Sequence, residues 1–129
     1  YRGERSSLLG EVLRPVAAVQ FRSDSGQWLP TLMYVDSGAD LTLIPKDFGK
    51  LLGMNLHENL GLVSGISGAL LRVSLQSADI RIGGRTARAK VAAALRNDVP
   101  YLLGREGLFK MFKIVFQEYR SLVRFDSPR

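Results

Sequence analysis

Hydrophobic and polar residues alternate along this chain in short runs, a pattern that predicts many β-strands rather than long helices. Between the runs stand clusters of Gly, Ser, Asp and Asn, which are typical of turns. The strands expected from this pattern are 16–21, 28–35 with an interruption at Pro30, 41–44, 70–75, 78–82, 86–94, 114–116 and 122–125. The last two should pair as a terminal hairpin.

Helical patterns are few. Residues 45–52 suit one or two helical turns that end at Gly53, and residues 105–112 suit a second short helix. Residues 55–60 are polar and weakly patterned, which indicates a surface loop that carries His57. The expected fold is therefore all-β with one or two short helices.

Length and composition indicate one globular domain. The chain has 129 residues, of which 46% are hydrophobic and 23% are charged. The absence of cysteine excludes disulfides, thiolate metal sites and cysteine nucleophiles. The chain shows neither a membrane-spanning run nor a signal-peptide pattern, so we expect no membrane contact from this segment. Because it begins at Tyr1 rather than Met, we expect a fragment or processed form whose missing sequence could hold an anchor, and the localisation stays open.

The net charge of +6 raises the question of nucleic-acid binding. The densest basic group, residues 81–90, is built on Gly83-Gly84, and its basic residues alternate with apolar or small ones. This period of two is typical of a hairpin with one solvated face, and no aromatic residues are interleaved to stack on bases. We therefore expect no nucleic-acid partner.

The strand predicted at 28–35 runs directly into Asp36-Ser37-Gly38. A carboxylate at the end of an apolar run is costly to bury unless another group shares its charge or its proton. Ser37 offers a hydroxyl, and Gly38 lets the backbone turn sharply and approach a ligand closely. The segment fits either a catalytic acid or an ordinary Asp-Ser-Gly turn at the end of a strand.

Two further segments favour the first interpretation. Gly65 and Gly68 surround Ile66 between two strand-like arms, which predicts a hairpin tip with freedom to move. Residues 101–105 repeat the order of residues 33–38, with an apolar strand, a glycine and a turn. This echo suggests an internal pseudo-repeat.

With these segments in register, residues 14–116 resemble the retropepsins, the retroviral-type aspartic peptidases. Residues 36–40 match the family's Asp-Ser/Thr-Gly-Ala-Asp. The tip at 65–68 lies at the place of the glycine-rich flap, with Ile66 in place of the flap-tip isoleucine. Residues 102–105 match the motif that precedes the family's helix, and Arg14-Pro15 matches the Arg-Pro ahead of the first core strand.

The resemblance implies an acid-protease fold: a closed or partly open β-barrel with one short C-terminal helix, half of a pepsin-like enzyme. It also implies an aspartic endopeptidase that needs no metal and no cofactor. The chemistry requires two carboxylates, whereas the chain has one Asp-Ser-Gly, so a homodimer would supply Asp36 twice. The two Asp36 side chains would share a proton and activate a water, while Ser37 braces the paired loops and the flap excludes solvent.

The resemblance also assigns contacts with a peptide or protein substrate. The residues concerned are Tyr34, Gly38, Ala39, Asp40, Leu43, Gly65, Ile66, Pro100 and Leu102. Their largely apolar character favours hydrophobic residues around the scissile bond. The resemblance further implies a partly buried ion pair between Asp40 and Arg105, with Arg14 of the partner subunit joining Asp40. The simpler interpretation is two unrelated surface charges.

The ends of the chain depart from the viral enzymes. About thirteen residues precede Arg14, and a hairpin at about 113–125 follows the expected helix, as in cellular or bacterial retropepsin-like domains. We expect a single domain over 1–129, with its core at about 14–116. The sequence does not specify the strength of the dimer or the geometry of its interface. The main alternative is a non-catalytic retropepsin-like module for dimerisation or peptide binding. A serine triad using His57 is disfavoured because no Gly-x-Ser-x-Gly elbow is present.

Overall fold

The computed structural model describes residues 2–6, 10–36, 38–64, 70–106, 113–117 and 122–126. Strands make up most of this part of the chain, and one helix is present in it. The elements are β1 (Arg2–Ser6), β2 (Gly10–Arg14), β3 (Val16–Arg22), β4 (Trp28–Val35), β5 (Thr42–Ile44), α1 (Lys46–Leu51), β6 (Leu60–Ser64), β7 (Leu70–Ile82), β8 (Arg85–Ala94), β9 (Leu102–Leu103), β10 (Lys113–Gln117) and β11 (Leu122–Asp126).

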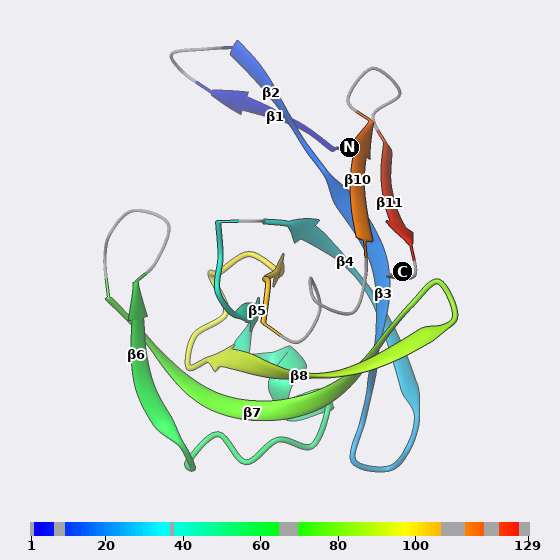
Figure 1. Ribbon diagram of the computed structural model, residues 1–129. Helices are drawn as coiled ribbons and strands as arrows, with labels where there is room; N and C mark the ends of the chain where they lie inside the picture. Colours follow the sequence, from blue (N-terminus) through cyan, green and yellow to red (C-terminus); the bar gives the residue numbers. More distant parts are fainter. Residues whose placement is uncertain are drawn as a thin grey trace.

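Six strands form a closed barrel. Neighbouring strands are hydrogen-bonded in the order β3-β4-β9-β5-β8-β7, and β7 returns to β3 at Gln20↔Arg81 and Phe21↔Ile80. Strand β6 pairs with β7 outside this ring (Figure 1). The all-β barrel predicted from the sequence is therefore confirmed.

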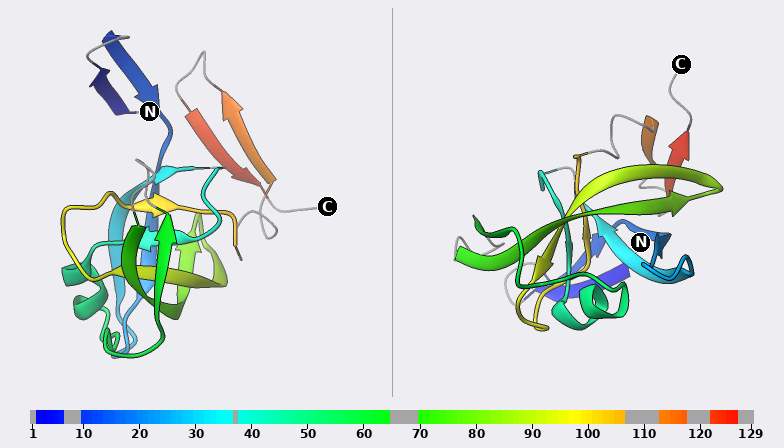
Figure 2. Two further views of the ribbon diagram at one scale, coloured as in Figure 1. Left: turned by 90° about the vertical axis from the view of Figure 1, so that its left-hand side faces the viewer. Right: turned by 90° about the horizontal axis from the view of Figure 1, so that it is seen from below.

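The barrel interior is filled by one side of each strand. On β3, the buried Ala17, Val19 and Phe21 alternate with exposed or half-buried residues, as expected for strands with one solvated face. Helix α1 packs against one side of the barrel (Figure 2). There the ring of Phe48 meets that of Phe21 edge-on, with the ring centroids 5.4 Å apart. The helix ends before Gly53, whose φ of +85° suits glycine, as predicted.

The long β7–β8 hairpin confirms the predicted basic hairpin. Its turn is Gly83-Gly84, and both residues have positive φ, as a tight two-residue hairpin turn requires. The sequence predicted two strands where the structure has the single strand β7. Gln76 and Ser77 do not break it, because both pair with β8, Gln76 opposite Val91 and Ser77 opposite Lys90.

Strand β4 also continues through Pro30, where an interruption was predicted. Pro30 lies opposite Gln20 of β3, whereas β9 pairs with β4 only at Tyr34 and Val35. Pro30 is thus on a stretch of β4 with one open edge, where the missing N–H is tolerated.

Two hairpins lie outside the barrel (Figures 1 and 2). The pairing of β10 with β11 confirms the predicted terminal hairpin. The β1–β2 hairpin was not predicted, because its strands contain charged residues and glycine rather than an apolar alternation. Of the helix predicted at 105–112, only Arg105 and Glu106 are among the described residues. No helix in the described part of the chain has the length and apolarity needed to cross a membrane.

Candidate active site

The two segments of the pseudo-repeat lie side by side. Strands β4 and β9 are parallel, with Tyr34 opposite Leu102 and Val35 opposite Leu103. The amide of Asp36 continues this ladder by donating to the carbonyl oxygen of Leu103 at 3.0 Å. Pairing with β9 therefore fixes the end of β4, and Asp36, the next residue, lies at the edge of a hollow.

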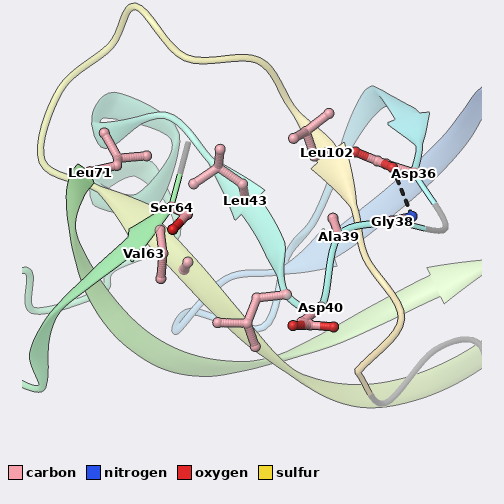
Figure 3. A pocket seen from close by; sticks show the side chains of 11 residues that line it. Asp36, Gly38, Ala39, Asp40, Leu43, Val63, Ser64, Leu71 and Leu102 are labelled. Carbon is pink, nitrogen blue, oxygen red and sulfur yellow. Dashed lines mark hydrogen bonds between the residues drawn. The ribbon is translucent and has the colours of Figure 1, made fainter. Parts of the chain in front are cut away.

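The backbone folds back around the carboxyl group of Asp36. The amide of Gly38 donates to Oδ1 of Asp36 at 2.9 Å, and the amide of Ala39 donates to the carbonyl oxygen of Asp36 at 3.2 Å (Figure 3). A Cβ atom at Gly38 would lie only 3.3 Å from Oδ1, so a larger residue would press on the carboxylate. Asp36 itself is half-buried. Ser37 lies outside the described residues.

A second segment holds the Asp36 loop from the other side. The amides of Arg105 and Glu106 donate to the carbonyl oxygens of Ala39 and Asp40 at 3.0 and 2.9 Å. We call residues 103–106 the clasp. The amide of Gly104 donates to the hydroxyl of the fully buried Thr42 at 3.1 Å.

Close packing explains the glycine in the clasp. A Cβ atom at Gly104 would collide with the backbone carbonyl of Leu41. Thr42 was not among the predicted site residues. Its signal was a hydroxyl inside the apolar run 41–44, a position where a buried side chain needs a hydrogen-bonding partner.

The structure contains an ion pair between Arg105 and Asp40, with Nη2 and Oδ1 2.5 Å apart. The side chains are 55% and 82% exposed, so the expectation of a partly buried pair is wrong. Both side chains start from loop residues, and Asp40 also lines the hollow beside Asp36. The side chain of Arg14 lies outside the part of the chain that the structure describes.

A hollow of about 250 Å³ opens beside Asp36 (Figure 3). Its lining includes six of the residues singled out from the sequence: Asp36, Gly38, Ala39, Asp40, Leu43 and Leu102. It also includes Leu41 and four residues that were not predicted: Val63, Ser64, Leu71 and Ala92. Three of these four flank the predicted glycine-rich tip, which was their only sequence signal.

Other predicted residues lie elsewhere. Tyr34 and Pro100 line a separate hollow of about 180 Å³, together with Leu32. Gly65 and Ile66 lie outside the described residues. The main hollow is mostly apolar, and the only carboxyl groups among the described residues that line it belong to Asp36 and Asp40.

The loop between β8 and β9 carries a further exposed ion pair, between Arg96 and Asp98. The hydrogen bond from Arg96 lowers the pKa of Asp98. Neither residue lines the hollow beside Asp36. Among the described residues, no group of three His, Asp or Glu side chains is placed to hold a metal ion.

Comparison with known proteins adds one finding. The family model described as aspartyl protease matches residues 19–106, which run from the middle of β3 through β9 and include the Asp36 loop and the clasp. The search of curated proteins gave no match. The matched segment contains every residue that lines the hollow.

Proposed function

Because the chain belongs to the retropepsin-like aspartyl proteases, we propose that it is an endopeptidase whose active site forms between two copies. Each copy supplies one Asp36. Family membership supports protease activity in general. The pairing of the two copies, the acid dyad and the preference for apolar side chains are our proposal.

The observation that carries the proposal is that the two carboxylates in the hollow differ in exposure and in bonding partners. Asp40 is paired with Arg105 and is mostly exposed. Asp36 is half-buried, is bonded to the backbone of its own loop, and lies where two strands converge. A single copy therefore offers one carboxylate suited to the reaction, and a dyad needs a second copy.

The proposed reaction follows from two like charges held close together. The pair retains one proton, because both groups cannot ionise side by side. The charged Asp36 takes a proton from water, which attacks the carbonyl carbon of the scissile bond. The protonated Asp36 donates to the carbonyl oxygen. The leaving amine is protonated as the carbon–nitrogen bond breaks.

The lining of the hollow supports a preference for apolar substrate side chains. Leu43 and Leu102 lie on its walls, with Val63 and Leu71 across from them (Figure 3). Burial of an apolar side chain against these residues removes apolar surface from water and anchors the peptide next to Asp36.

A digest of a peptide library tests the proposal. Wild-type protein should cleave between or beside apolar residues, and an active-site inhibitor of aspartic peptidases should stop it. Asp36→Asn keeps the shape of the side chain but cannot act as base or share the proton, so it should abolish cleavage. Cleavage by pure Asp36→Asn protein would rule the mechanism out. A wild-type protein that binds these peptides without cleaving them would favour a binding module.

A further inference from the structure

The outward face of β4 is apolar, unlike the outward face of β8. On β8, the outward positions carry the polar or charged Thr86, Arg88 and Lys90. On β4, the outward positions carry Trp28, Pro30, Leu32 and Tyr34. Leu32 is 53% exposed. A solvated strand normally places polar residues outward, so this face of β4 has a composition suited to covering by another molecule.

A groove of about 500 Å³ runs along this face. Its lining includes Pro30 and Leu32 of β4, their β3 partners Gln20 and Ala18, and Arg81 of β7. We call this feature the β4 groove. Cross-strand partners lie on the same side of a sheet, so these side chains form one continuous surface.

One end of the β4 groove carries a positioned cation. The guanidinium of Arg81 lies over the ring of Trp28 at 4.2 Å, and its Nε donates to Oε1 of Gln20 at 2.7 Å. These contacts hold the side chain in one orientation. The N–H groups on Nη1 and Nη2 of the guanidinium are further donors. A carbonyl or carboxylate oxygen of a bound chain could accept from them.

The β4 groove adjoins a second hollow, which lies next to the candidate active site. Leu32 lines both this groove and the hollow that Tyr34 and Pro100 share. Tyr34 is the next outward residue after Leu32, and it lies opposite Leu102, which lines the hollow beside Asp36. Along a strand, Leu32 is roughly 13 Å from Asp36. An extended peptide covers that distance with about four residues.

We propose that the β4 groove binds a segment of the protein substrate about four or more residues away from the scissile bond. This inference rests on the proposed function, since it takes Asp36 as the point of cleavage. An apolar side chain of the substrate covers Leu32 and Pro30, and an oxygen of its chain accepts from Arg81. The groove meets the hollow of Tyr34 and Pro100, two residues that the family resemblance assigns to substrate contact, and this favours the substrate over an unrelated partner.

Substrate length tests the inference. A sequence cleaved in the library digest is prepared as a short peptide, with about three residues on each side of the scissile bond, and as a long peptide with about ten. The kcat/KM of both is measured for wild type, Leu32→Gln and Leu51→Gln. Leu51 is a matched control, since it is 65% exposed and lies on α1 rather than in the groove.

Leu32→Gln should lower kcat/KM for the long peptide about tenfold, through KM, because the contact covers one leucine side chain. The short peptide should be cleaved at the wild-type rate, and Leu51→Gln should leave both unchanged. Equal loss on both peptides would overturn the inference, as would no loss on either. A Leu32→Gln protein with weaker self-association would instead make the groove an interface between copies. If the library digest gives no cleaved sequence at all, the proposed function fails rather than the groove alone.

Discussion

The amide of Asp36 donates a hydrogen bond to the carbonyl oxygen of Leu103 at 3.0 Å, which joins the candidate catalytic residue to the clasp. The amides of Arg105 and Glu106 donate to the carbonyl oxygens of Ala39 and Asp40. The amide of Gly104 donates to the side-chain hydroxyl of Thr42. The position of Asp36 therefore depends on a segment from the other end of the barrel sequence. Changes in the clasp should affect both the fold and the activity.

Gly104→Ala should destabilise the protein by about 2–3 kcal/mol, because the new methyl group meets the backbone of Leu41, which cannot move aside like a side chain. Gly61→Ala is a suitable control, since its Cβ would be 3.9 Å from the nearest atom, Cδ1 of Leu75. Urea unfolding of both variants measures the difference. Equal stability of the two variants would show that the clasp is looser than described.

Arg105→Ala should cost only about 0–1 kcal/mol, because both members of its ion pair with Asp40 are well exposed. The melting temperature should change about as much as for Arg88→Ala, which removes the ion pair with Asp79. High salt should reduce both effects. A loss near 3 kcal/mol would indicate a pair that is desolvated in the assembled protein.

Local sequence patterns predicted much of this fold. The Gly83-Gly84 turn predicted the β7–β8 hairpin, and the apolar run before Asp36 predicted β4. Both elements form from residues that are close together in the sequence. Contacts between distant segments were not predictable in the same way. The closure of β7 onto β3 and the bond from Gly104 to Thr42 become visible only when the barrel is assembled.

In the candidate site, too, the local motif was predictable and the residues from distant strands were not. Asp36, Gly38 and Ala39 belong to one motif and were found together. Ala92 lines the hollow from near the end of β8, between Leu43 of β5 and Leu75 of β7. Nothing in its own stretch of sequence distinguishes it from the neighbouring buried alanines, so only the sheet register shows which of them faces the hollow.

Activity should depend on pH as a bell-shaped curve with its maximum in acid or mildly acidic solution. Loss of the shared proton removes the general acid at high pH, and a second proton removes the general base at low pH. A profile of kcat/KM measures both limbs, with circular dichroism at each pH as a control for unfolding. A rate that rises steadily into alkaline pH would indicate another nucleophile.

The central claim is that two copies share one active site. A monomer should be inactive, so specific activity should fall when the protein is diluted below the concentration at which the dimer dissociates. Dilution alone does not identify the shared residue. Mixing wild type with Asp36→Asn protein does, because a mixed dimer would have one functional acid.

The most direct measurement is therefore cleavage by a fixed amount of wild type in the presence of a ninefold excess of Asp36→Asn chains. Co-purification of differently tagged chains first shows that subunits have exchanged. Random pairing leaves about a tenth of the wild-type chains with a wild-type partner, so activity should fall about tenfold relative to a sample in which all chains are paired as wild type. Unchanged activity per wild-type chain after complete exchange would contradict the shared site.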